Sequence, residues 1–91
     1  YEDYIIKVEG HTDNIPIKTA LYQSNWELSA HRSTNVVKKL ISSGIPQKRI
    51  RAIALADSHP LVPNFHPDGK YNYENQKKNR RIEVYIHRNF K

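Results

Sequence analysis

YIIKVEGHTD, residues 4–13, decides the fold because an apolar strand runs directly into a polar turn. Tyr4, Ile6 and Val8 fall on one face of the strand, with polar side chains between them. This period of two is typical of a strand that buries one face. The His-Thr-Asp sequence at 11–13 then lies at the carboxyl end of the strand, where open α/β folds usually bind ligands. The stretch therefore predicts both a sheet and a place for a site.

Composition limits the possible function classes. The 91 residues are enough for one small core and contain no cysteine, which excludes a disulfide framework and a thiolate metal site. The formal charge of +6 favours an anionic partner, and nucleic acid, acidic lipid and acidic cell-wall polymer all fit it. No apolar run approaches the ~20 residues of a membrane span.

A helix is predicted from its start and stop signals. Ser24 and Glu27 form a capping box, and helical spacing continues to Ser43. The Gly-Ile-Pro sequence at 44–46 then ends the helix, because glycine can adopt the left-handed conformation and proline cannot continue a helix. One helix face should pack on the sheet and consists of Trp26, Ala30, Ser33, Val37, Leu40 and Ile41.

Two further strands are predicted. At 51–56, Ile53 and Leu55 fall on one face and small alanines on the other, and at 81–86 apolar and polar residues alternate. The segment 57–78 between them is interpreted as a long loop because it contains three prolines and an Asp-Gly turn. Strands joined by a helix should be parallel, and the last strand can return antiparallel. We therefore expect one α/β domain over residues 1–91. Three strands provide little area for a hydrophobic core, so we also expect a further strand and helix upstream.

Asp13 and Arg32 are the candidate binding pair. Arg32 lies about 10 Å into the helix and shares its outward side with Leu28, an apolar residue that the helical pattern does not explain. If the turn folds back, a fixed carboxylate beside a guanidinium suits a zwitterion such as an amino-acid head group. Spacing alone leaves two alternatives open. Thr12 and Asp13 can simply satisfy backbone donors in the turn, or the pair can be an ordinary surface salt bridge.

Other motifs point away from catalysis. The five histidines show no metal-ligand spacing, and neither a nucleophile motif nor a glycine-rich phosphate loop is present. We therefore expect no metal and no cofactor. The basic run at 77–81 could contact phosphates, and Tyr71 and Tyr73 keep base stacking open, so a charge-driven nucleic-acid binder remains a third alternative.

Four sequence blocks carry a resemblance to a known family: VEGHTD (8–13), SNWELSAHR (24–32), ADSHPLVPN (56–64) and NRRIEVYI (79–86). In this order they resemble the OmpA-like peptidoglycan-binding family. The resemblance implies a βαβαββ two-layer sandwich that binds peptidoglycan without catalysis. Within the family, the Asn-Ile-Pro-Ile extension and the SNWELSA block are most similar to the periplasmic domain of MotB-type flagellar stator proteins.

The resemblance also implies a site. Asp13 matches the family aspartate that holds the ammonium of diaminopimelate, and Arg32 matches the arginine that holds its carboxylate. Further positions match the lining of the family's pocket: Thr12, Asn25, Arg80 and, as a wall, Leu28. We expect alanine at Asp13 or Arg32 to weaken binding and to leave the fold intact, because both side chains should lie at the surface.

The resemblance implies a cellular setting as well. A stator member would be a homodimer in the periplasm, with a membrane anchor in the inner membrane and a MotA-like channel partner. An outer-membrane or lipoprotein tether of the OmpA or Pal type is the alternative within the same ligand class. Nucleic acid is not an expected partner. The role of the long loop 65–78 stays open.

Overall fold

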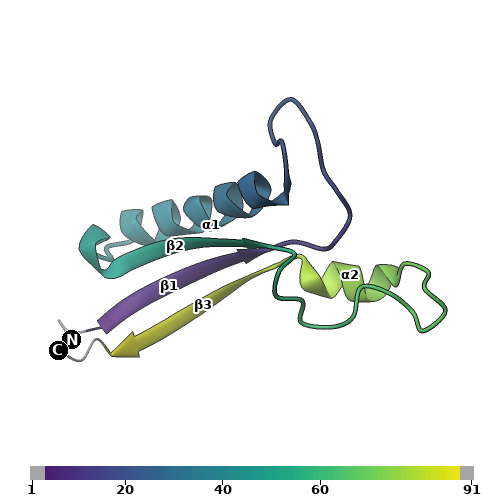
Figure 1. Cartoon of the computed structure of the whole chain (residues 1–91). Helices are drawn as coiled ribbons and strands as arrows, with labels where there is room; N and C mark the ends of the chain where they lie inside the picture. Colours follow the sequence, from purple (N-terminus) through teal and green to yellow (C-terminus); the bar gives the residue numbers. More distant parts are fainter. Residues whose placement is uncertain (1–3, 89–91) are drawn as a thin grey trace.

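The computed structural model describes residues 4–88. Its elements follow the chain in this order: β1 (Tyr4–His11), α1 (Asn25–Ser42), the 3₁₀ turn η1 (Gln47–Arg49), β2 (Ile50–Ala56), α2 (Tyr73–Asn79) and β3 (Arg81–Arg88). The strand order is β2-β1-β3, with β1 parallel to β2 and antiparallel to β3. Figure 1 shows α1 on one face of the sheet, and α2 with its long connection beyond one end of it. The predicted α/β class and strand directions are confirmed.

Local signals set both ends of α1. Ser24 is the N-cap, and its Oγ accepts a hydrogen bond from the backbone N–H of Trp26 at 3.2 Å. At the other end Gly44 has φ +116°, and the N–H of Ile45 donates to the carbonyl of Leu40 at 3.2 Å. This is a Schellman ending, which satisfies carbonyls that the helix leaves open. Both predicted ends of the helix are confirmed.

The core lies between α1 and the strands β1 and β2. Its buried centre is Ile6, Val8 and Ile50, and the partly buried residues packed on it are Tyr4, Val36, Val37, Leu40, Ile41, Ile45 and Ile82. The prediction that Trp26 joins this face is wrong, since its side chain is 50% exposed. Gly10, close to the end of β1, already faces Ser29. The preceding helical turn, which carries Trp26, therefore lies past the end of β1.

The helix and the sheet approach each other most closely at Gly10. A Cβ at this position would lie 2.3 Å from the carbonyl oxygen of Ser29, so only glycine fits. Beside it, the N–H of Ala56 donates to Ser29 Oγ at 3.1 Å, and the N–H of Thr12 donates to the Ala56 carbonyl at 2.8 Å. Ala56 has φ +50°, an uncommon conformation for a residue with a side chain. These contacts hold the end of β1 against α1.

The segment 57–78, predicted as a loop, contains most of α2, and this is a correction. Asn72 caps this helix, whose buried residues are Gln76 and Asn79. Gln76 Nε2 donates to Asn14 Oδ1 at 2.8 Å and so ties α2 to the turn after β1. Because α2 buries polar rather than apolar side chains, its sequence has no hydrophobic period to signal a helix.

The predicted apolar face of β3 is only partly covered. Ile82 packs against the core, whereas Val84 and Ile86 are exposed. Val84 pairs with the buried Val8, so it lies on the same side of the sheet as α1. Since α1 packs mainly over β2 and β1, it leaves Val84 and Ile86 uncovered in the part of the chain that the structure describes.

Candidate functional site

A cavity of about 280 Å³ lies between the turn after β1, the first half of α1 and the residue that follows α2. Its lining consists of Thr12, Asp13, Ile15, Pro16, Ile17, Asn25, Leu28, Arg32 and Arg80. Every site residue predicted from the sequence therefore lines one cavity. Leu28, which the helical pattern could not explain, is part of its wall.

Asp13 is the buried anion of this cavity. Its side chain accepts hydrogen bonds at both oxygens, from the backbone N–H of Ile15 to Oδ1 at 2.9 Å and from Arg80 Nη1 to Oδ2 at 2.5 Å. The residue is only 7% exposed, so the prediction that it lies at the surface is wrong. The turn after β1 folds the carboxylate inward, and the Arg80 guanidinium covers it. Removing this carboxylate would therefore also disturb the turn.

Thr12 and Asn25 shape the turn that carries Asp13. Thr12 is buried, and its hydroxyl donates to the carbonyl oxygen of Asp13 at 2.8 Å. Asn25 Nδ2 donates to the carbonyls of Asp13 at 3.3 Å and Ile15 at 3.1 Å. Because Asn25 is the first residue of α1, it fixes the turn to the start of that helix. The two side chains thereby hold Asp13 in place.

Arg32 is the free cation of the cavity. It is exposed on α1, and within residues 4–88 its guanidinium has no hydrogen-bond or ion-pair partner. Arg80, the second guanidinium, is paired with Asp13. The cavity thus holds two guanidinium groups and one carboxylate, a formal charge of +1. A ligand that brings a carboxylate would find an unpaired, bidentate donor in Arg32.

Sequence reasoning missed two features of this site. The Asp13–Arg80 ion pair joins residues 67 positions apart, and no local pattern signals such a contact. The apolar wall formed by Ile15, Pro16 and Ile17 was visible only as a hydrophobic interruption in a polar loop.

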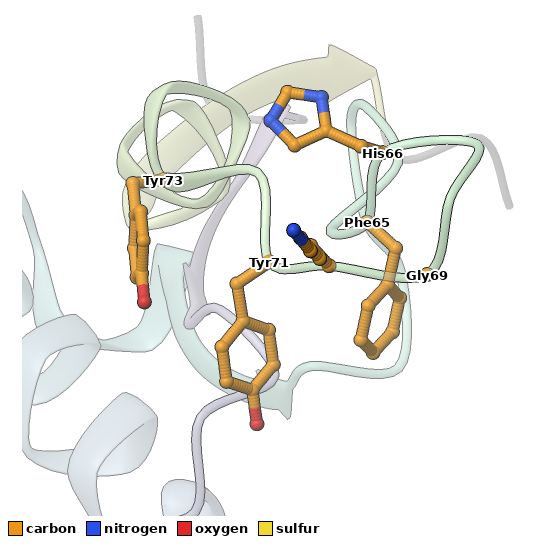
Figure 2. Close-up of a pocket in the computed structure, with 6 residues that line it drawn as sticks. Phe65, His66, Gly69, Tyr71 and Tyr73 are labelled. Atoms are coloured by element: carbon orange, nitrogen blue, oxygen red, sulfur yellow. The ribbon is translucent and has the colours of Figure 1, made fainter.

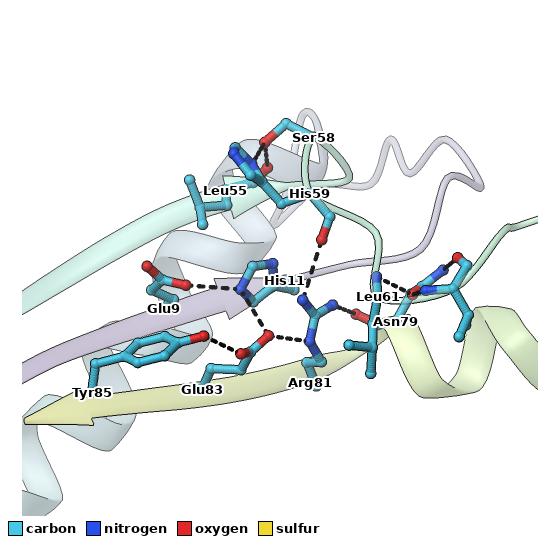
Figure 3. A network of polar contacts seen from close by, with 11 residues as sticks. Glu9, His11, Leu55, Ser58, His59, Leu61, Asn79, Arg81, Glu83 and Tyr85 are labelled. Carbon is cyan, nitrogen blue, oxygen red and sulfur yellow. Dashed lines mark hydrogen bonds and ion pairs between the residues drawn. The ribbon is translucent and has the colours of Figure 1, made fainter.

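A second polar cluster lies on the sheet face opposite α1 (Figure 3). Glu9 and Glu83 are directly opposite each other on β1 and β3, an arrangement in which like charges repel. Buried His11 lies between them, with Nε2 3.2 Å from Glu9 and 3.6 Å from Glu83. Arg81 and the Tyr85 hydroxyl also bond Glu83, and the Tyr85 bond is the main cause that lowers the pKa of Glu83. The cluster relieves the repulsion and joins the two strands.

Within the described range 4–88, neither a metal-ligand group nor a membrane-crossing helix is found. No three histidine, aspartate or glutamate side chains within it are grouped in a way that could hold a metal ion. None of its helices combines the length and the apolar character needed to cross a membrane.

Comparison with known proteins identifies the family. The model of the OmpA family matches residues 1–74. The chain belongs to the OmpA family. The sequence-based resemblance is thereby confirmed.

Relatives of this OmpA-family chain include motility proteins. It is 45% identical over 82 residues to the uncharacterized protein YtxE of Bacillus subtilis, covering 89% of this chain and 31% of that protein. It is 38% identical over 82 residues to motility protein B of Bacillus subtilis, covering 89% of this chain and 29% of the relative. The chain thus spans about a third of the length of these curated relatives.

Solved structures show the same relationship. The C-terminal domain of Helicobacter pylori MotB matches with a TM-score of 0.83 and 28% identity over 99% of this chain and 64% of that one. A structure of the periplasmic domain of the same protein gives a TM-score of 0.80 with 28% identity, covering 97% of this chain and 52% of that one. The predicted similarity to MotB-type members of the family is confirmed.

Proposed function

We propose that this chain is a non-catalytic peptidoglycan-binding module that anchors a MotB-like flagellar stator to the cell wall. The similarity to motility protein B and to the periplasmic domain of MotB supports the biological setting. The observation that carries the binding proposal is the cavity that joins Asp13, Arg32 and Arg80. Its ligand is the free end of diaminopimelate in the stem peptide.

The charges of the cavity match those of an amino-acid terminus. Asp13 accepts the ligand's ammonium, since each carboxylate oxygen can accept more than the one hydrogen bond it has here. Arg32 donates to the ligand's carboxylate, because its planar guanidinium can form two parallel hydrogen bonds. The aliphatic chain lies against Leu28 and Ile17 on the wall.

Arg80 makes the site selective for zwitterions. An ammonium that approaches Asp13 meets a carboxylate already neutralised by Arg80 at 2.5 Å. A ligand that also carries a carboxylate offers Arg80 a replacement partner, so little electrostatic energy is lost when the ion pair loosens. An amine without a carboxylate offers no such exchange. Binding should therefore need both groups on one carbon.

Calorimetric titration with three matched compounds tests this proposal. meso-Diaminopimelate carries both groups, cadaverine has the same chain without carboxylates, and pimelate lacks the ammonium groups. We expect saturable binding of diaminopimelate and at least about tenfold weaker binding of the other two, since a hydrogen bond to a charged group contributes about 1.5–3 kcal/mol. Equal affinity for all three compounds would contradict the proposed recognition.

Single substitutions test which side chain binds the carboxylate of diaminopimelate and which binds its ammonium. Arg32→Ala should lower diaminopimelate affinity at least about tenfold without loss of stability, because this side chain is exposed and unpaired in the described range. Asp13→Asn is preferable to alanine, since the amide oxygen can still accept from Ile15 while the charge is removed. Arg51→Ala on β2, also exposed, is the matched control. Pulldown with purified peptidoglycan should show the same order, and equal retention of all four proteins would refute the assignment.

The proposal extends to the whole protein. It would be a homodimer whose binding domain lies in the periplasm, held by an inner-membrane segment and assembled with a MotA-like channel protein. Fractionation of cells that produce the full-length protein tests this, with recovery in the inner membrane together with the channel protein as the expected result. Recovery in the outer membrane would instead indicate an OmpA or Pal type of tether.

A further inference from the structure

The connection between β2 and α2 carries a hydrogen-bonded hairpin, residues 64–72, here named the aromatic hairpin. Its ends are joined by a hydrogen bond from the N–H of Asn72 to the carbonyl of Asn64 at 2.8 Å. Nearer the tip, the N–H of His66 donates to the carbonyl of Lys70 at 2.7 Å. These bonds fix the backbone of the segment that sequence analysis interpreted as part of a loop.

Three aromatic rings stand in a row on this hairpin and the first residue of α2 (Figure 2). The Phe65 and Tyr71 rings stack with centroids 5.5 Å apart at 23°, and the Tyr73 ring lies 6.1 Å from Tyr71. They are exposed by 48%, 39% and 70% respectively. A cavity of about 710 Å³ lies along them. Ordered, exposed aromatic groups of this kind mark binding surfaces, because water is easily displaced from them.

The charge around the rings favours a neutral ligand. Within residues 65–74, Lys70 is outnumbered by Asp68 and Glu74, so the segment has a formal charge of −1 with histidine neutral. The whole chain has a charge of +6. A phosphate backbone is bound through lysine and arginine, and the aromatic hairpin itself lacks the surplus of these residues that nucleic acid requires, whereas the basic run at 77–81 begins one turn further along α2. Uncharged sugar rings have no such requirement.

The aromatic hairpin is linked through α2 to Arg80, which lines the Asp13 cavity. α2 connects them, with Tyr73 as its first residue and Arg80 directly after its last, about 10 Å apart along the helix axis. Figure 1 shows α2, its long connection and the turn after β1 beyond the same end of the sheet. A polymer whose charged side branch occupies the cavity would bring its main chain near the hairpin.

We propose that the aromatic hairpin binds the glycan strand of peptidoglycan while the cavity holds the stem peptide. The apolar C–H face of a pyranose ring stacks on the electron-rich face of an aromatic ring. Tyr73 is the main platform, because its ring is the most exposed. The inference rests on the proposed function for the choice of polymer.

Titration of the full chain with chitotetraose tests it. This neutral chain of four N-acetylglucosamine units carries no peptide and no charge. We expect saturable binding, with shifts of amide signals in residues 64–74 in NMR spectra. Tyr73→Ala should weaken binding about threefold to tenfold, whereas Tyr73→Phe should keep it because the ring face is retained. Trp26→Ala, on an aromatic residue of α1 that is 50% exposed, is the control and should bind like the original chain.

Diaminopimelate titrations of the same samples separate the two proposals. Tyr73→Ala should retain diaminopimelate affinity, and Arg32→Ala should retain chitotetraose affinity. Absence of chitotetraose binding, or equal binding by Tyr73→Ala, would overturn the glycan site whatever diaminopimelate does. Loss of diaminopimelate binding alone would overturn only the peptide site. Binding of oligothymidylate in place of chitotetraose would assign the rings to single-stranded nucleic acid and refute the glycan inference.

Discussion

Replacing Gly10 by alanine should force α1 away from β1. The added Cβ would lie 2.3 Å from the carbonyl oxygen of Ser29, and also 3.0 Å from its carbonyl carbon. These are backbone atoms, so no side-chain rotation can relieve the contact. The helix has to move by at least 0.7 Å to bring the shortest contact from 2.3 to 3.0 Å, the lower limit for real Cβ contacts.

The cost should lie at the upper end of the range for overpacked sites. Added methylene groups in cores cost about 1–3 kcal/mol when neighbours can adjust, and here a whole helix must adjust, which gives about 3 kcal/mol. A small domain has a free energy of unfolding of roughly 5–15 kcal/mol, so this is a large fraction. The expected fall in Tm is at least about 12 °C. Since α1 carries Arg32, diaminopimelate affinity should fall as well.

Urea unfolding followed by circular dichroism measures this cost. Gly69→Ala is the matched control, because a Cβ there meets nothing within 4 Å and its φ of +88° makes alanine unfavourable by about 1–2 kcal/mol. Gly10→Ala should lower the unfolding midpoint more than Gly69→Ala, with an unchanged m-value. If the two variants lose the same free energy of unfolding, the reasoning from the close approach of α1 and β1 is refuted.

Two further predictions concern buried and paired polar groups. Asn79→Ala removes the acceptor for the backbone N–H groups of Leu61 and Val62, so unfolding should become easier by about 3 kcal/mol, and a Tm within about 4 °C of the original would contradict this. Tyr85→Phe removes the hydroxyl that lowers the pKa of Glu83 below 4.5, so NMR titration of this carboxyl should show a rise toward that value. A lowered folded pKa stabilises the protein above the unfolded pKa and loses that effect as pH falls through the folded pKa. The Tyr85→Phe variant should therefore be less stable than the original above about pH 4.5, and the difference should vanish as the pH falls through the folded pKa of Glu83.

The parts of the fold that depend on neighbouring residues could be predicted from the sequence. Ser24 and the Gly-Ile-Pro sequence at 44–46 set the ends of α1 through contacts within one turn, so their residue types are sufficient evidence. The alternation in β1 and β3 likewise identified strands, because side-chain direction has a period of two. Trp26 was misplaced because the helical pattern gives a face but not the point where the sheet ends.

Contacts between distant segments could not be predicted in the same way. α2 is held by Gln76 and Asn79, whose amides replace the apolar residues that a helical period requires. For the site, the resemblance suggested Asp13 and Arg32, and the structure places both on one cavity. The resemblance could not reveal that Asp13 is buried under Arg80, because that pairing depends on where α2 and β3 lie relative to β1.

Because β1 lies between β2 and β3, one of its edges stays unpaired until β3 is available. β1, α1 and β2 can assemble once residue 56 has left the ribosome, whereas β3 pairs with β1 only after residues 81–88 have been synthesised. Contacts over such sequence separations form slowly. The guanidinium that covers Asp13 comes from residue 80, so a nascent chain leaves this carboxylate uncovered. The Asp13–Arg80 ion pair therefore forms only after β1, α1 and β2 have been synthesised.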